Sequence, residues 1–248
     1  MSMRTIDLNA DLGEGGSQDA ALIALVSSAN IACGGHAGDD KTMRAAIDAC
    51  LAAGVAVGAH PGYEDREHFG RRPMSLAPAA VTELVASQLG RFAEIAARAG
   101  ARVHHVKPHG ALYNQSDRDS KLAAAVVEGV ASVVPDCLFY APPAGALAAA
   151  AKMAGLRLRA EGFADRRYTE SGELVPRGKA GAMIEEVGEA VAQAMQIASK
   201  GRVQTTAGTW FPLPAQTFCV HGDSLHALEI LRAVRQALVA VGIKVQAQ

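Results

Sequence analysis

Histidine and aspartate residues follow apolar runs at five separated points of the chain, each time with glycine close by. They are Asp11, His36, His60, His109 and His221. Glycine lets a ligand approach the backbone closely, and the imidazole ring titrates near neutral pH. A carboxylate with two or three imidazoles can hold a divalent metal ion, or it can place general acid and base groups around a substrate. The residue types are compatible with both kinds of site. The pattern predicts one shared polar site.

Each of these residues, taken alone, is more simply explained as a hydrogen-bonded structural residue. The same feature at five strand ends makes a shared site the better interpretation. His68, His104 and His226 lack this glycine context, and we interpret them as structural or surface residues.

A lysine stands where an apolar run ends. Lys107 lies between Val106 and Pro108, and an unpaired charge is costly in such a place. We therefore expect Lys107 to bind the carboxylate or phosphate of a ligand.

Further charged residues follow the later strands. Asp165, Arg166 and Arg167 lie in a polar segment, where charges exposed to solvent are an equal alternative to a functional role. Asp223 is also suited to be the N-cap of the last helix, and Glu14 is similarly ambiguous.

The candidate site residues must be positioned by the strands that precede them. Seven apolar runs are predicted as strands, at residues 5–9, 29–33, 55–59, 103–107, 138–141, 156–161 and 217–220. Helices are predicted between and after them, at about residues 18–28, 39–54, 78–100, 117–134, 143–154, 182–199 and 224–241, with a polar loop at 162–181 and a short extra strand at 203–206. Repeated strand–helix units with near-continuous apolar strands predict a parallel sheet covered by helices.

A closed barrel explains the polar residues better than an open sheet does. An open sheet concentrates its chemistry at one or two switch points, whereas here almost every strand end carries a polar cluster. We therefore predict an α/β fold in which residues 1–248 form one seven-stranded, TIM-like β/α barrel domain, and the length and the hydrophobic half of the chain suit one large core.

Composition and charge indicate which classes of partner are not expected. A net charge of -1 and a pI near 6.7 predict no nucleic-acid partner, and no apolar run is long enough for a membrane span. The N-terminus lacks a signal-peptide layout, and Cys33, Cys50, Cys137 and Cys219 fit no paired motif, so we expect reduced core thiols and a cytoplasmic protein.

Two nucleotide-binding patterns are nearly matched but incomplete. In GEGGSQ, Gln18 stands where the third glycine of a dinucleotide fingerprint belongs, and GELVPRGKA has Ala180 in place of the Ser or Thr of a P-loop. Neither segment predicts a nucleotide site.

Several longer motifs resemble one known family along essentially the whole chain. The stretches DLNADLGEG, SSANIACGGHAGD, GAHPGY with FGRRPM, VKPHGALYN, EGFADRRY with GELVPRG, and CVHGD are similar to the LamB/YcsF family. The resemblance implies a barrel related to polysaccharide deacetylases. It also implies a hydrolase in which 5-oxo-L-proline, ATP and water give L-glutamate, ADP and phosphate, with this chain as the A subunit beside separate B and C subunits.

That reaction suggests roles for the predicted residues. We assign Lys107, with Arg167, to the phosphate or the substrate carboxylate, and His109 or Asp11 to the base that activates water. Further catalytic residues are Asp165, His221 and Asp223, and further substrate-binding residues are Glu14, His36, His60 and Asn114. Asp11, His36 and His60 also resemble the Asp-His-His set of the related deacetylases, so a divalent metal ion there is a hypothesis.

Two other functions stay open at this point. The barrel is a non-catalytic scaffold subunit in the first, and a metal-dependent amidohydrolase or deacetylase without ATP in the second. ATP-dependent turnover that needs all three proteins, and that is lost with His109, separates the predicted function from both.

Overall fold

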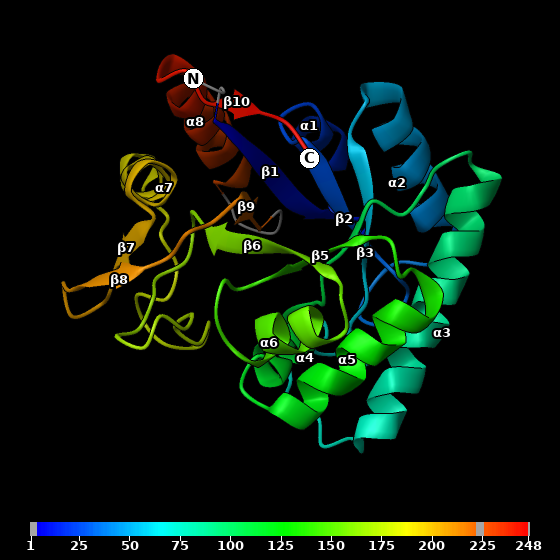
Figure 1. Ribbon diagram of the computed structural model, residues 1–248. Helices are drawn as coiled ribbons and strands as arrows, with labels where there is room; N and C mark the ends of the chain where they lie inside the picture. Colours follow the sequence, from blue (N-terminus) through cyan, green and yellow to red (C-terminus); the bar gives the residue numbers. More distant parts are fainter. Residues whose placement is uncertain (1–3, 222–225, 248) are drawn as a thin grey trace.

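The computed structural model describes residues 4–221 and 226–247. Parallel strands close into a barrel, because β1 pairs with β2 on one side and with β9 on the other. In order around the barrel (Figure 1) they are β1 (Thr5–Leu12), β2 (Ser28–Ala32), β3 (Ala56–His60), β4 (His105–Val106), β5 (Leu138–Ala141), β6 (Arg157–Phe163) and β9 (Thr217–Val220). The predicted seven-stranded β/α barrel is confirmed.

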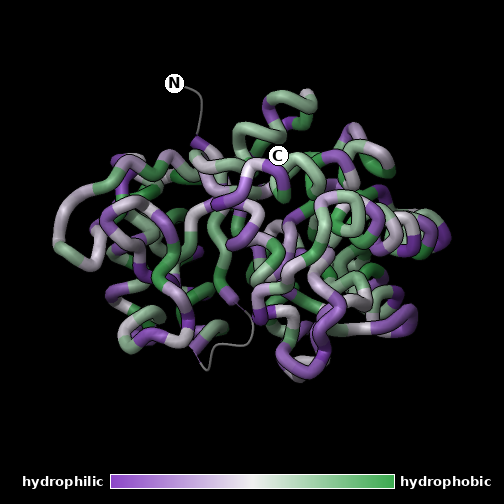
Figure 2. Tube along the Cα trace, turned by 90° about the horizontal axis from the view of Figure 1, so that it is seen from below, coloured by the Kyte–Doolittle hydropathy of each residue, from purple (hydrophilic) through white to green (hydrophobic). Residues whose placement is uncertain are grey.

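Helices surround the barrel (Figure 1). They are α1 (Asp19–Ile23), α2 (Asp40–Ala53), α3 (Pro78–Arg98), α4 (Gly110–Ser116), α5 (Ser120–Val133), α6 (Ala146–Met153), α7 (Val187–Lys200) and α8 (Ala227–Ala240). Figure 2 shows the peripheral helices changing between hydrophobic and hydrophilic residues along their turns. Each therefore has an apolar face to bury against its neighbours.

Local sequence signals define the second helix at both ends. The Asp39 side chain accepts the backbone N–H groups of Lys41 and Thr42 at the start of α2, both at 2.9 Å. Gly54 ends the helix in the left-handed region with φ 68°, which glycine adopts without strain. The Asp39 cap thereby fixes the loop between β2 and α2 that carries His36.

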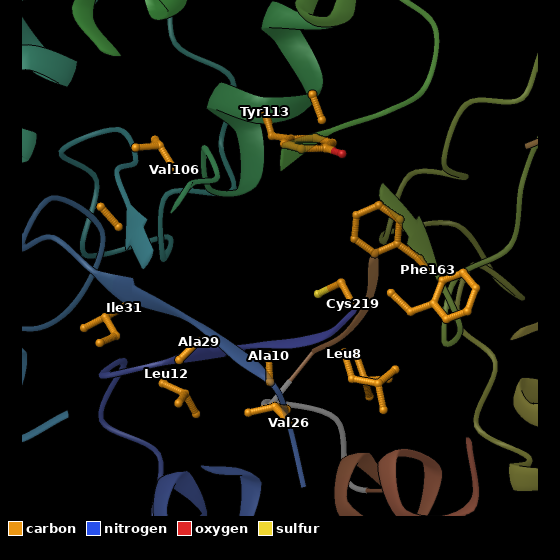
Figure 3. Packing of buried hydrophobic residues seen from close by; sticks show 14 of the residues in the cluster. Leu8, Ala10, Leu12, Val26, Ala29, Ile31, Val106, Tyr113, Phe163 and Cys219 are labelled. Carbon is orange, nitrogen blue, oxygen red and sulfur yellow. The ribbon is translucent and has the colours of Figure 1, made fainter. Parts of the chain in front are cut away.

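The strands separate apolar from polar side chains. Leu8, Ala10 and Leu12 are buried on one face of β1, and Figure 3 shows Leu8 and Leu12 on the side that faces the helices. The alternate residues Asp7 and Asn9 point into the barrel, because side chains alternate across a strand. The inside of the barrel is therefore polar and its outer layer apolar.

Some element boundaries differ from the predictions. The helix expected at 18–28 ends at Ile23, since Ser27 and Ser28 bond to Asp7 and lead into β2. The helix expected at 182–199 begins only at Val187. The preceding residues lie against the loop after β6 instead, where Met183 forms a β-bridge with Arg166.

Another misplaced boundary lies after the fourth strand. Asp117 ends α4 rather than starting the next helix, and Asp119 is the N-cap of α5. The single helix predicted from residue 117 is therefore wrong at its start, because the short helix α4 precedes it.

In the part of the chain that the structure describes, three short strands lie outside the barrel. The extra strand predicted at 203–206 is β7 (Arg202–Gln204), which forms an antiparallel hairpin with β8 (Trp210–Pro212). β10 (Lys244–Val245) is an addition to the predicted elements, and it joins the outer edge of β1 in parallel.

The cysteines are buried and free, as expected of core thiols. Within residues 4–221 and 226–247, no helix combines the length and the apolarity that a membrane crossing requires.

Candidate active site

Hydrogen-bonded polar side chains fill the inside of the barrel. At the end where the strands begin, Asp7 accepts from Ser27 Oγ at 2.6 Å, Ser28 Oγ at 2.7 Å, Tyr140 OH at 3.0 Å and Thr217 Oγ1 at 2.6 Å. These donors lie on or beside β2, β5 and β9. A fully bonded carboxylate of this kind makes a rigid floor for the groups above it.

A layer of amides connects this floor to the mouth of the barrel. Asn30 Nδ2 donates to Asn9 Oδ1 at 2.7 Å and to Asp11 Oδ1 at 2.8 Å, and His105 Nε2 lies 2.8 Å from Asn30 Oδ1. Gly58 makes room for the imidazole, because any side chain there would overlap the His105 ring. Asp11 is thereby held from below.

Lys107 is the central cation of the site. Its Nζ lies 3.2 Å from Asp11 Oδ1, 3.2 Å from Glu161 Oε1 and 2.9 Å from Cys219 Sγ, and the residue is 2% exposed. Burial acts to lower the pKa of Lys107, but Asp11, Cys219 and Glu161 raise it well above its ordinary value. The ammonium group is therefore charged and already paired with the protein's own carboxylates.

The two carboxylates beside Lys107 have pKa values shifted in opposite directions. Burial acts to raise the pKa of Asp11, yet His60 and Lys107 hold it well below its ordinary value. Burial raises the pKa of Glu161 despite the opposing effect of Lys107, while Tyr113 OH donates to Glu161 Oε2 at 2.9 Å. Neighbouring carboxylates whose pKa values are shifted in opposite directions are typical of active sites in which one group acts as an acid and another as a base.

Backbone carbonyls fix the orientation of two histidines at the mouth. His60 Nδ1 lies 2.6 Å from Lys107 O, and His109 Nε2 lies 2.9 Å from Phe69 O. A carbonyl oxygen only accepts, so these ring nitrogens carry the hydrogens. The remaining ring nitrogens, His60 Nε2 and His109 Nδ1, lie 3.0 Å apart.

Two carboxylates lie beside these histidines, but in different clusters. Glu14 groups with His36, His60 and His109, whereas Asp11, expected with His36 and His60 in a metal site, groups with Cys219 and His221. Asp11 Oδ2 lies 3.4 Å from His60 Nε2, and Glu14 Oε1 lies 3.5 Å from His109 Nδ1 and 3.1 Å from His36 Nε2. Burial and then His60 lower the pKa of His36 to about 3, and burial with His60 and His36 lowers the pKa of His109 well below its ordinary value. Neutral imidazoles and the anionic oxygen of Glu14 form a donor set for a divalent cation.

A strained turn supports this cluster. Phe69 has φ 56°, an uncommon conformation for a bulky residue, and the turn directs its carbonyl at His109. Gly70 follows with φ 60°, and a side chain there would press on His36 and His109. These two rings stack with centroids 3.6 Å apart.

His221 forms a second, separate pair. Its Nδ1 lies 2.9 Å from Asp165 Oδ2, and its backbone N–H donates to the same oxygen at 3.0 Å. Burial lowers the pKa of His221 although Asp165 opposes the shift, and His221 keeps the pKa of the buried Asp165 below its ordinary value. A carboxylate that orients an imidazole from behind leaves Nε2 as the nitrogen for proton transfer.

These groups surround one cavity of about 580 Å³. Of the predicted site residues, those that line it are Asp11, His60, Lys107, His109, Asn114 and His221. Glu14 and His36 contact His109 and line a smaller neighbouring pocket of about 380 Å³. Asp165 is fully buried and reaches the cavity through His221.

One predicted residue points away from the site. The guanidinium of Arg167 pairs with Glu189 of α7, with Nη2 2.9 Å from Oε2, and Arg167 is not among the described residues that line the cavity. The reason is geometric. Consecutive side chains in an extended segment point in opposite directions, so Arg166 points into the cavity and Arg167 points away from it. Asp223 lies outside the described residues.

Some residues of the site were not predicted from the sequence. Glu161 is a buried charge in the second half of β6, which is buried throughout, and a charge among buried strand residues is the signal that identified Lys107. Arg71, Arg118 and Arg177 also line the cavity, as does Arg166, for which exposure to solvent was an equal alternative. The sequence carries no comparable signal for these arginines, since their placement depends on how the loops fold back.

The fold is that of the deacetylase-like β/α barrels, and the mouth of this barrel is polar. A solved family 4 carbohydrate esterase from Streptomyces lividans has the same fold, with a TM-score of 0.52, 14% identity, and coverage of 98% of this chain and 91% of that one.

Closer relatives place the chain more narrowly. The family model for LamB/YcsF matches residues 6–248, and the chain belongs to this family. It is 47% identical to the A subunit of 5-oxoprolinase from Methylococcus capsulatus, over 98% of this chain and 96% of that protein. The crystal structure of a lactam utilization protein from Thermus thermophilus superimposes with a TM-score of 0.92 at 39% identity, and the match covers 98% of this chain and 100% of that one. The predicted family is confirmed.

Proposed function

We propose that this chain is the A subunit of an ATP-dependent 5-oxoprolinase and that it carries out the ring-opening step. The names of its relatives support the substrate class. The observation that carries the step is the cluster of Glu14, His36, His60 and His109 beside the cavity, with Asp11 Oδ2 3.4 Å from His60 Nε2. Such a set can hold a water molecule, directly or on a metal ion, next to a bound lactam.

The chemistry explains why ATP is needed. A lactam carbonyl is a poor electrophile, and phosphorylation of its oxygen makes the ring carbon more electrophilic. Water then adds to that carbon, the C–N bond breaks to release the ring nitrogen, and hydrolysis of the resulting acyl phosphate gives glutamate and phosphate. In this proposal separate B and C subunits take part with ATP in the cytoplasm, and this chain receives the activated ring. The incomplete nucleotide-binding patterns in the sequence agree with that division.

Residues of this chain have distinct roles in the ring-opening step. Asp11 stays anionic beside Lys107 and accepts a hydrogen bond from the attacking water. His221, oriented by Asp165, transfers the proton that releases the ring nitrogen. Glu161 and Lys107 hold Asp11 in place and keep the cavity floor electrically balanced.

The residues present fit a divalent metal ion. Glu14, His36, His60 and His109 offer ligand atoms that all lie within 4.8 Å of one another, and two of the rings have the opposite nitrogen bonded to a carbonyl, as metal-binding histidines do. A bound ion would lower the pKa of a coordinated water and polarise the substrate oxygen.

The test is reconstitution with His109→Ala. ATP hydrolysis and glutamate formation are measured separately in the complex of the three subunits. We expect ATP hydrolysis to continue while glutamate formation falls by about 10²-fold or more, because His109 is one of the groups that hold the attacking water in place. Glutamate formation at the unmodified rate would exclude the proposed role of this site.

A second candidate function follows from the same cluster. A metal-dependent amidohydrolase would open a cyclic amide without ATP, and the histidine and glutamate donors fit that chemistry equally well. Elemental analysis of the purified chain, followed by incubation of the chain alone with 5-oxoproline and no ATP, separates the two. Glutamate formed under those conditions, and lost on chelation, would favour the second function.

A further inference from the structure

The cavity contains more positive than negative charge. Among the described residues that line it, the cationic side chains are Arg71, Lys107, Arg118, Arg166 and Arg177, and the carboxylates are Asp11 and Asp119. His109 and His221 add little positive charge, because burial lowers the pKa of each ring. The cavity is therefore suited to an anionic ligand.

The cations differ in where they lie. Lys107 is at the floor between Asp11 and Glu161, and Arg118 Nε donates to Glu173 Oε1 at 2.9 Å on the outer side. Arg166 lines the same cavity as Arg71 and Arg177, and charges of both signs act on it: Arg177 and Arg71 lower its pKa, while Asp165 and Tyr168 raise it. Three arginines that do not belong to the floor of the site therefore line this one cavity together with His221.

Arg166 is held in this cavity at an energetic cost. It is 3% exposed, and Nη2 donates to Val175 O at 2.6 Å. Its Nε is buried and has no hydrogen-bond partner among the described residues. Burial, and next the charge of Arg177, lower the pKa of Arg166 to about 10. A buried donor without an acceptor is destabilising unless a ligand supplies one.

The backbone around Arg166 is fixed on both sides. Arg166 forms an antiparallel bridge with Met183, and its carbonyl accepts from Gln193 Nε2 at 2.8 Å. The next residue, Arg167, points the other way and pairs with Glu189. The chain thus directs one arginine inward and leaves the other outside, which provides a matched pair for comparison.

We propose that Arg166, with Arg177 and Arg71, forms a subsite for a phosphoryl group beside His221. Guanidinium groups bind phosphate oxygens through paired N–H donors, and several guanidinium groups can share one tetrahedral dianion. A planar monocarboxylate would engage only one such fork. The use of the subsite rests on the proposed function, because a lactam phosphorylated on its amide oxygen carries this group.

Phosphate binding to the isolated full-length chain tests the subsite directly. Inorganic phosphate is titrated by calorimetry into the wild-type chain and into the variants Arg166→Gln, Arg166→Lys and Arg167→Gln. We expect phosphate affinity to fall by about tenfold or more in Arg166→Gln, to fall less in Arg166→Lys, and to change by less than about twofold in Arg167→Gln. Acetate at the same concentration should compete weakly.

Several outcomes would overturn the proposal. They are equal phosphate affinity in the two glutamine variants, no measurable binding by the wild-type chain, or competition by acetate as strong as by phosphate. Circular dichroism checks that Arg166→Gln folds. If it does not, Arg177→Gln takes its place, because Arg177 is only partly buried and its loss should weaken phosphate binding in the same way.

The subsite and the proposed function can fail separately. Phosphate binding is measured without ATP, lactam or partner subunits, so it does not depend on ring opening. If Arg166→Gln weakens phosphate binding while His109→Ala still allows glutamate formation, the subsite stands and the proposed function fails. If Arg166→Gln and Arg167→Gln bind phosphate equally while His109→Ala abolishes glutamate formation, the proposed function stands and the subsite fails.

Discussion

Two walls of the cavity present opposite kinds of groups. One side, here called the lone-pair wall, is formed by the ends of β1 and β3 and by the loops after β1, β2 and β4. Asp11, His60 and His109 of this wall line the cavity, and Glu14 and His36 lie behind His109. The segment after β6 contributes donors, from Arg166 and Arg177. One wall is suited to hold a cation or a water molecule and the other to hold an anion, so a substrate between them would be polarised.

The walls are also built differently. The lone-pair wall lies directly at strand ends, and backbone carbonyls fix the tautomers of its rings. The arginine wall lies on irregular backbone, connected by the isolated bridges of Arg166 with Met183 and of Tyr168 with Leu174 and Thr205. Strand ends in a closed barrel resist local opening more than such a segment does. The difference suggests that the arginine wall adapts to a ligand while the other stays preorganised.

Removal of His60 should have the largest effect on the lone-pair wall. His60→Ala deletes the ring that connects Asp11 to His109, and we expect glutamate formation by the complex to fall by about 10³-fold or more. His226→Ala, on the partly exposed start of α8, is the control and should leave the rate unchanged. Equal rates for the two variants would show that the lone-pair wall is structural only.

Neutralisation of the central cation tests how far the lone-pair wall depends on Lys107. Lys107→Met keeps the apolar stem but leaves Asp11 and Glu161 unbalanced, so we expect a loss of about 3–5 kcal/mol in the free energy of unfolding. Urea denaturation measures it, with the exposed Lys121→Met as control. Adding Glu161→Gln to Lys107→Met should recover part of the loss, and no recovery would contradict the assigned pairing.

Acid should destabilise the lone-pair wall before it affects the arginines. The pKa of His36 is about 3 in the fold, so between pH 3 and 6.5 the unfolded chain binds more protons and stability falls as the pH falls. At pH 5 this one residue accounts for about 2 kcal/mol. Urea denaturation at pH 7.5 and pH 5 should show this loss. His36→Asn should reduce the pH dependence, whereas His68→Gln, on an exposed ring, should not.

The outward-facing arginine should matter least. Arg167→Ala removes an ion pair with Glu189 whose partners are both partly exposed, and surface pairs contribute about 0–1 kcal/mol. We expect the free energy of unfolding and the rate of glutamate formation to change little. A loss of glutamate formation as large as that of His60→Ala would restore the substrate role that the sequence suggested for Arg167.

The sequence was most informative where chemistry and strand pattern coincide. Asp11, His60 and His109 could be placed at one mouth because apolar runs mark the strands and glycines mark the turns after them. The alternation in DLNADL is a further local signal, since it places Asp7 and Asn9 on the face opposite to the leucines.

Other parts of the site depend on contacts between distant segments. In the sequence Glu161 is only the last residue of a predicted strand, and the closed barrel brings it to Lys107. The opposite directions of Arg166 and Arg167 follow from a bridge to Met183, which no local pattern predicts. The short helix α4 escapes prediction because it follows its strand after only three residues, and Asp117 resembles the cap of the next helix.

The bonds made by Asp7 also have a consequence for how the chain reaches this fold. Its carboxylate accepts from donors on or beside β2, β5 and β9, and each donor is in place in only one alignment of those strands. A slip of one residue would turn every side chain of a strand to the opposite face, so leucines would enter the barrel and Asp7 would be buried without partners. Asp7 therefore favours the correct register during folding. Strand pairs that form out of register are less stable, because they bury its carboxylate without hydrogen-bond donors.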